Sequence, residues 1–266
     1  MKLIKKIKLI IKKKYIMRRM LSKLLVKSED SKTYAKFCEQ VYGKNLTQFN
    51  MANMEQINKL IEVLNLDENS KVLDLGCATG KISEYISDLT NAQITGIDYV
   101  KNAIKRAKER TLNKSSKLIF QHMDLNNLKF PENSFDAIIA IDTIYFAHNV
   151  RKLIGKLKKL LKQNGTMAIF YSQSIKPEES KKLLLSNNTK LAIALDKNNL
   201  KYDCYDFTQM DMNHWKKSKE VAEKLREEFE NEGNSFIYFG RKYESENWLE
   251  YAESNRNSRY LYHIKL

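Results

Sequence analysis

The sequence predicts an α/β protein built on a doubly wound, Rossmann-like sheet. Between residues 72 and 172, short apolar segments typical of buried strands alternate with amphipathic segments of helical period. The helical segments are about ten to fifteen residues long, as expected of connections between parallel strands covered on both faces. A chain of 266 residues is long enough to bury one large core with further elements around it.

The elements of the core follow from hydrophobic periodicity. A helical region from 31 to about 65 comes first. The expected strands of the core then cover residues 72–75, 94–98, 117–123, 135–142 and 166–172. Helices are expected between them at 81–89, 101–110 and 150–162, the last ending at Asn164-Gly165. No internal repeat and no long Gly/Ser linker divides this region, so it is read as one domain.

The C-terminal third has a different pattern. Helical stretches are expected at 177–186 and 188–198, and a sixth strand at 201–207. A long charged helix is expected at 213–233, a further helical piece at 244–253, and a final strand with alternating apolar positions at 258–266. The predicted organisation is therefore a basic arm, 1–30, and a Rossmann-like domain, 31–266, with helical cap segments at about 31–65 and 209–256.

The formal net charge of +15 is concentrated at the N-terminus. Residues 1–27 contain eleven Lys or Arg, and the first acidic residue is Glu29, which leaves about +4 for the other 239 residues. Apolar residues within the arm keep helical spacing, as in basic helices that bind anionic membranes or nucleic acid. A Lys-rich composition of the whole chain, or a start at Met17 or Met20, is the favoured explanation of the arm.

Several classes of protein are disfavoured. The three cysteines, Cys38, Cys77 and Cys204, have no paired or metal-ligand spacing, so neither a disulfide framework nor a metal site is expected. No run of about 18 apolar residues predicts a membrane span. We expect a cytoplasmic protein, with peripheral membrane binding through the arm as the alternative.

The loop after the first strand carries the main functional signal. The segment KVLDLGCATG places Gly76 and Gly80 where a doubly wound sheet binds its ligands. The spacing G-x-x-x-G differs from both the dinucleotide fingerprint and the P-loop. Asp98 ends the second strand, 18 residues after Gly80, and a carboxylate at that place can accept hydrogen bonds from ribose hydroxyls. A ligand with a sugar and a charged amino-acid tail fits this pattern.

Across residues 34–175 the sequence resembles the class I S-adenosylmethionine-dependent methyltransferases, particularly those acting on quinones, sarcosine and phosphoethanolamine. The matching motifs are VLDLGCATG, GIDYV, HMDLNNLKFPENSFDAIIAID and LKQNGTMAIF, in the family's order and spacing. The resemblance implies a seven-stranded sheet whose last strand, 258–266, runs antiparallel between strands five and six. It also implies S-adenosylmethionine as the cofactor.

The resemblance also assigns cofactor-binding residues. The loop around the methionine part of the cofactor would contain Asp74, Gly76 and Gly80. Asp98 would bind the ribose hydroxyls, and Tyr99, Asp124 and Leu125 would contact the adenine. The sulfonium would lie above Ile141 and Asp142. Ala78 departs from the family, because most relatives have a glycine there, and its methyl group is expected to narrow the loop.

Methyl transfer needs alignment and exclusion of water, and a general base only where the nucleophile arrives protonated. Tyr145 and His148, which follow the fourth strand, are the catalytic candidates; packing of Tyr145 and simple exposure of His148 are the alternatives. The expected acceptor is a small molecule with an N, O or C nucleophile. Aromatic cap residues, among them Tyr34, Tyr42 and Trp215, are interpreted as pocket or core.

Three other functions remain open at this stage. A nucleic-acid methyltransferase would use the basic arm, although the segment IDTIYF after the fourth strand lacks the proline motif of enzymes that act on base nitrogens. An NAD-dependent oxidoreductase is disfavoured by the glycine spacing. A non-catalytic protein that binds S-adenosylmethionine is the third alternative.

Overall fold

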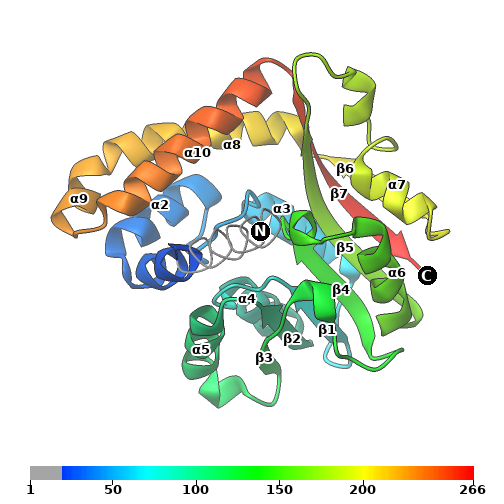
Figure 1. Ribbon diagram of the computed structural model, residues 1–266. Coiled ribbons are helices and arrows are strands. Elements are labelled where there is room, and N and C mark those ends of the chain that lie inside the picture. The colour runs from blue at the N-terminus through cyan, green and yellow to red at the C-terminus, as the bar shows by residue number, and fades with distance from the viewer. Residues whose placement is uncertain (1–19) are drawn as a thin grey trace, which may run out of the picture.

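The computed structural model describes residues 20–266 and contains one seven-stranded sheet in the order β3-β2-β1-β4-β5-β7-β6 (Figure 1). β7 runs antiparallel to both of its neighbours, while β1 to β5 pair in parallel. The strands are β1 (Lys71–Leu75), β2 (Gln93–Asp98), β3 (Leu118–His122), β4 (Phe135–Ile141), β5 (Leu161–Ser174), β6 (Tyr202–Asp206) and β7 (Asn257–Lys265). The predicted fold class, including the antiparallel last strand, is confirmed.

Helices cover both faces of the sheet. Within β4, Ile138 and Ala140 pack toward α6 (Val150–Leu160) and α7 (Lys190–Asp196), whereas Ala137 and Ile139 pack toward the opposite face. That opposite face is covered by α3 (Met54–Leu64), α4 (Lys81–Thr90) and α5 (Lys101–Arg110). Because successive side chains of a strand alternate in direction, an apolar strand such as β4 fits only a sheet buried on both faces.

Side-chain caps fix where several of these helices begin. The side chain of Asn53 accepts a hydrogen bond from the backbone N–H of Gln56 at the start of α3. Asn149 does the same for Lys152 at the start of α6. Such caps satisfy N–H groups that have no partner within the helix. They therefore fix the start of α6 just after His148, at the carboxyl edge of the sheet.

A cap of helices stands beside this sheet at the upper left of Figure 1. It consists of α2 (Lys32–Tyr42), α8 (Thr208–Lys224), α9 (Arg226–Asn231) and α10 (Ser235–Glu253). Tyr34 and Phe37 of α2 are fully buried against Phe229 and Ile237. The cap therefore has an apolar core of its own, which includes the expected cap aromatics Tyr34 and Tyr42 but not Trp215.

Residues 20–30 form a helix that lies against α5. Leu25 packs on Val100 and Ala103, and two ion pairs, Glu29–Arg110 at 2.6 Å and Asp30–Arg106 at 2.7 Å, hold its C-terminal end. Residues 1–19, with most of the expected basic arm, lie outside the described residues. None of the described helices is long and apolar enough to cross a membrane.

Four sequence-based boundaries were wrong. The helical piece expected at 244–253 begins at Ser235, as α10. The helix expected at 177–186 is only a short 3-10 turn, Lys181–Leu184, and Leu184 is the one buried residue of that segment. The helix expected at 213–233 begins at Thr208 and is divided between α8 and α9. β5 begins at Leu161 rather than 166, through a register shift against β4 that follows the end of α6.

Candidate active site

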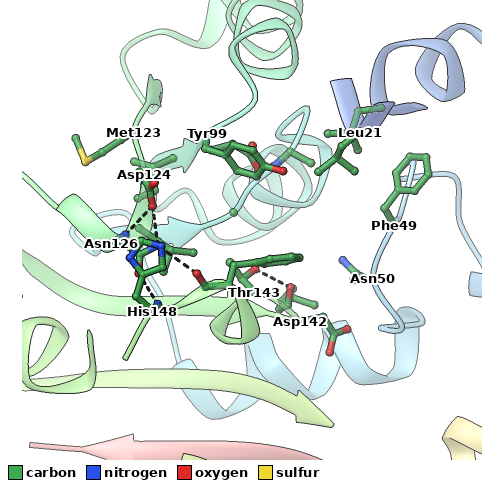
Figure 2. Close-up of a pocket in the computed structure, with 18 residues that line it drawn as sticks. Leu21, Phe49, Asn50, Tyr99, Met123, Asp124, Asn126, Asp142, Thr143 and His148 are labelled. Carbon is green, nitrogen blue, oxygen red and sulfur yellow. Dashed lines mark hydrogen bonds between the residues drawn. The ribbon is translucent and has the colours of Figure 1, made fainter. Parts of the chain in front are cut away.

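A cavity of about 410 Å³ opens at the carboxyl ends of β1, β2, β3 and β4 (Figure 2). This is the edge where parallel α/β sheets bind their ligands. The lining combines the glycine loop, the ends of the strands, the loop before α3 and the helix 20–30. The predicted site residues in the lining are Gly76, Asp98, Tyr99, Asp124, Leu125, Ile141, Asp142 and His148.

Gly76 provides close packing between the glycine loop and the end of β4. Its φ of 74° is in the left-handed region, and a Cβ at this position would lie 2.5 Å from Cγ2 of Thr143. Gly80 also has a left-handed φ, and a Cβ there would meet the ring of Phe120. Gly80 precedes α4 and does not contribute to the lining of the cavity, so its visible role is packing.

Asp98 is the best-defined polar group of the cavity. One carboxylate oxygen accepts the N–H of Ala78 at 3.0 Å, and the other accepts the N–H of Val100 at 2.7 Å. Burial raises the pKa of Asp98, while these two hydrogen bonds act in the opposite direction. The carboxylate is therefore fixed between the glycine loop and the start of α5, and its remaining lone pairs are available to a ligand.

Ala78 has a φ of 49°, a conformation in which a Cβ costs about 1–2 kcal/mol. It lies in the wall of the cavity, and its N–H reaches Asp98. The departure from glycine noted in the sequence is therefore accommodated by backbone strain rather than by a different turn. The hydrogen bond to Asp98 helps to hold the strained conformation.

Asp74 lies beneath the glycine loop and borders a smaller cavity of about 40 Å³. That cavity also contains Lys81 in its lining and shares Gly76, Ala78 and Ile141 with the larger one. The Ser83 hydroxyl donates to Asp74 at 2.5 Å. Burial is the main cause that raises the pKa of Asp74 to about 6. The side chain is thus a buried hydrogen-bonding group that ionises at a higher pH than an exposed Asp.

The other end of the cavity is formed by the segments after β2 and β3. Tyr99, Met123, Asp124 and Leu125 contribute to its lining, and Figure 2 shows Tyr99 and Asp124 on this side. Asn126 donates to Asp124 at 2.9 Å and accepts the backbone N–H of His148 at 2.7 Å. The segment after β3 and the segment after β4 are therefore connected through Asn126.

Asp142 joins the cavity to the buried interior. It has a left-handed φ of 53° and receives two hydrogen bonds from the guanidinium of Arg259, at 2.8 and 3.0 Å. The N–H of Met51 and the hydroxyl of Tyr145 also donate to this carboxylate, at 2.9 and 3.2 Å. Arg259 lies in β7 and its side chain is fully buried.

The two catalytic candidates occupy different positions. His148 is exposed and forms part of the lining of the cavity. Tyr145 does not belong to the lining: its ring packs on Tyr171 with centroids 4.9 Å apart, and its hydroxyl accepts the N–H of Ser172. Burial of the hydroxyl, and then the charge of Asp142, raise the pKa of Tyr145. Tyr145 therefore orients Asp142 instead of facing the cavity.

Several lining residues were not predicted as site residues, namely Leu21, Leu25, Phe49, Asn50, Met123, Asn126 and Thr143. Leu21 and Leu25 lie on the apolar face of the helix 20–30, so helical periodicity was an available signal. Phe49 and Asn50 come from an irregular loop without a recognisable motif. Among residues 20–266, no cluster of three His, Cys, Asp or Glu side chains has the arrangement of a metal site.

The match to known families covers most of the chain. A family model described as a methyltransferase domain matches residues 66–256. Among curated relatives, phosphoethanolamine N-methyltransferase of Plasmodium falciparum is 36% identical over 136 residues, which is 50% of each chain. Sterol 24-C-methyltransferase erg-4 of Neurospora crassa is 30% identical over 136 residues, 50% of this chain and 35% of its own. The chain spans half or less of the length of these relatives.

Solved structures share the fold at low sequence identity. Phosphoethanolamine N-methyltransferase 2 of Haemonchus contortus, determined with S-adenosylhomocysteine, gives a TM-score of 0.74 at 18% identity, over 91% of this chain and 59% of its own. The cyclopropane synthase MmaA2 of Mycobacterium tuberculosis gives 0.70 at 11% identity, over 90% and 98%. The chain therefore belongs to the methyltransferase domain family, as the resemblance in its sequence predicted.

Proposed function

We propose that this protein transfers the methyl group of S-adenosylmethionine to a small-molecule acceptor with an N, O or C nucleophile. The observation that carries the proposal is the carboxylate of Asp98, held by the N–H groups of Ala78 and Val100 in the wall of the cavity. A carboxylate fixed between a glycine turn and the segment after β2 fits a nucleoside whose ribose donates two hydroxyls.

The residues present fit the rest of the cofactor. The methionine part would occupy the smaller cavity beside Asp74 and the glycine turn, where a Cβ at Gly76 would collide with Thr143. The adenine would lie between Tyr99 and Leu125, with Asp124 at its edge. When bound, the cofactor supplies an electrophilic methyl group on a sulfonium. The apolar side chains of Leu21, Leu25 and Phe49 would cover the bound cofactor and exclude water from the cavity.

The acceptor would enter beside Asp142, Thr143, Phe146 and His148, the part of the lining that lies beyond the sulfonium end. Here His148 would remove a proton from an acceptor that arrives protonated, as its position in the lining supports. Tyr145 would act indirectly, through its hydrogen bond to Asp142. The relatives methylate an amine nitrogen or a sterol carbon, as their names say, so the class of nucleophile has to be measured.

Calorimetric titration with S-adenosylmethionine, S-adenosylhomocysteine and NAD tests the cofactor assignment. We expect both sulfur compounds to bind and NAD not to bind. Binding of NAD alone would overturn the proposal. Turnover is then measured with phosphoethanolamine, sarcosine and a sterol as acceptors, using transfer of a labelled methyl group.

His148→Gln separates a catalytic from a binding role. For an acceptor that needs deprotonation, we expect kcat to fall by about 10²–10⁴-fold while the Kd for S-adenosylmethionine stays within about twofold. Lys105→Gln, an exposed change on α5, is the control. An unchanged kcat in His148→Gln would remove His148 from the list of catalytic groups.

The alternatives are outcomes of the same experiments. A protein that binds S-adenosylmethionine but methylates none of the small acceptors would favour the non-catalytic reading or a nucleic-acid substrate. Filter binding of RNA at two salt concentrations distinguishes these, because contacts to phosphates weaken steeply with salt. Comparing residues 20–266 with the full chain would show whether the basic arm contributes to RNA or anionic-vesicle binding.

A further inference from the structure

We propose that Arg259 is a positioning residue of methyl transfer: it neutralises Asp142, so that no unpaired carboxylate faces the sulfonium end of the cofactor site. The inference rests on the proposed function, because it takes the cofactor to be S-adenosylmethionine with its sulfonium near the end of β4. It concerns a residue outside the cavity lining, in β7, that acts through a residue inside it.

The geometry of the pair is specific. Each carboxylate oxygen of Asp142 accepts one guanidinium N–H of Arg259, at 2.8 and 3.0 Å. Side-chain exposure is 0% for Arg259 and 7% for Asp142. Two parallel hydrogen bonds between a planar guanidinium and a carboxylate fix the orientation of the carboxylate and compensate its negative charge. Asp142 is therefore held in one orientation at the edge of the cavity.

Other buried groups hold Arg259 in turn. Its Nε donates to the side-chain oxygen of Gln56 at 3.0 Å, and one terminal nitrogen donates to the hydroxyl of Ser172 at 3.0 Å. The guanidinium also lies over the ring of Phe170, 5.1 Å from its centroid. The side chain thus has contacts on α3, on β5 and on Asp142, the residue that follows β4. It has no room to change its partner without moving the sheet or α3.

The surrounding charges make the neutralisation by Arg259 necessary. Asp211 of α8 is fully buried, and burial raises its pKa to about 6, so it adds negative charge at neutral pH. His214 is also buried, and burial lowers its pKa to about 3, so it is neutral there. Arg259 therefore pairs with Asp142 and is also influenced by the charge of Asp211. Without it, Asp142 would present its full charge to the cavity.

This arrangement has an electrostatic consequence for the reaction. S-adenosylmethionine carries a positive sulfonium and S-adenosylhomocysteine a neutral sulfur. An unpaired carboxylate nearby would stabilise the sulfonium of the reactant, and that stabilisation would be lost as the positive charge leaves sulfur in the transition state. A neutral ion pair at the same place fixes the loop without this penalty. The ratio of the two dissociation constants therefore reports the charge at Asp142.

Two single variants should move that ratio in opposite directions. In Arg259→Gln the carboxylate loses its partner, and we expect the Kd of S-adenosylhomocysteine divided by that of S-adenosylmethionine to rise about five- to tenfold. In Asp142→Asn the guanidinium loses its hydrogen-bonded carboxylate and keeps only the more weakly coupled Asp211 as a buried counter-charge, so the ratio should fall more than twofold. Arg259→Lys and the double variant Asp142→Asn/Arg259→Gln should remain near the wild-type ratio.

The experiment is calorimetry with the full chain at about pH 8, where Asp211 stays in one ionisation state. Arg256→Gln is the control, because Arg256 also pairs with a carboxylate, that of Glu250 at 3.1 Å. Arg256 does not contribute to the cavity lining. Its ratio should equal that of the wild type. Thermal unfolding of each variant checks that it is folded before binding is measured.

The outcomes separate this inference from the proposed function. If the wild type binds neither sulfur compound, the proposed function fails. If the wild type binds both and the ratio stays within twofold in Arg259→Gln and Asp142→Asn, the charge role of Arg259 is overturned and the pair is only structural. Should Arg259→Gln fail to fold, Asp142→Asn decides alone, because asparagine can still accept a hydrogen bond from Arg259.

Discussion

The two sides of the carboxyl edge of the sheet are built in different ways. On the cofactor side, Asp98 is fixed by backbone N–H groups from segments that begin within a few residues of strand ends. On the cap side, Asp142 is fixed by Arg259, 117 residues away in the sequence, and by Met51, 91 residues away. The first side forms from local motifs, and the second exists only after the whole chain has folded.

This difference predicts different consequences of mutation. The backbone N–H groups remain in place when the carboxylate of Asp98 is removed, so the substitution should mainly lower the affinity for the cofactor. On the cap side, each buried charged group depends on its partner, and removing one leaves the other unpaired in a region of low dielectric constant. Substitutions on the cap side should therefore mainly lower the free energy of unfolding.

Arg259→Met is expected to have the largest effect. It leaves Asp142 as a buried carboxylate without its cation, and we expect the free energy of unfolding to fall by about 3–5 kcal/mol. Urea unfolding at neutral pH measures this loss. The double variant Asp142→Leu/Arg259→Met should recover most of it, because an apolar pair leaves no unpaired charge. A loss below about 1 kcal/mol in the single variant would contradict the comparison.

Asp74→Asn should change how stability depends on pH. The pKa of Asp74 is raised in the folded protein from 3.8 to about 6, so the unfolded chain releases this proton first as pH rises. The ligand-free wild type should therefore lose about 3 kcal/mol of stability, relative to the variant, between about pH 4 and pH 7. Asp211 has the same direction of shift but is present in both proteins and cancels. Parallel stability curves for the two proteins would refute the raised pKa.

Asp98→Ala should weaken the binding of S-adenosylmethionine by about 1–3 kcal/mol, because charge-assisted hydrogen bonds to the ribose are lost. The matched control is Asp203→Ala, which removes an exposed strand carboxylate on β6. Calorimetry gives the Kd of S-adenosylmethionine for both variants and for the wild type. Equal affinities in Asp98→Ala and the wild type would remove the ribose assignment.

Ala78→Gly is expected to have the smallest effect. Glycine relieves the left-handed strain of about 1–2 kcal/mol but loses about 0.5–1 kcal/mol through the entropy of the unfolded chain. We expect a net gain of up to about 1 kcal/mol in unfolding experiments, with affinity for the cofactor maintained. A clear loss of stability would show that the methyl group of Ala78 makes packing contacts that outweigh the strain.

The sequence alone determined the cofactor side. Hydrophobic alternation predicted the strands, and the glycine spacing with Asp98 and Asp124 predicted a ligand site at their carboxyl ends, where the structure has a cavity. These signals are readable because each depends on neighbours within a few residues, and because the order of βαβ units fixes where strand ends meet. Local patterns did not predict three features that packing decides. These are the start of β5 at Leu161, the division between α8 and α9, and the absence of a full helix at 177–186.

Only the tertiary structure decided what surrounds Asp142. The sequence placed it at a strand end and assigned it to the cofactor, but no local pattern connects it with Arg259 in β7, Gln56 in α3 or Met51 in the loop before that helix. Likewise, Tyr145 reads as a pocket residue until its hydroxyl is seen to reach Asp142 and Ser172. Buried polar groups find their partners across the fold, and burial, which makes those partners obligatory, is a property of the assembled molecule.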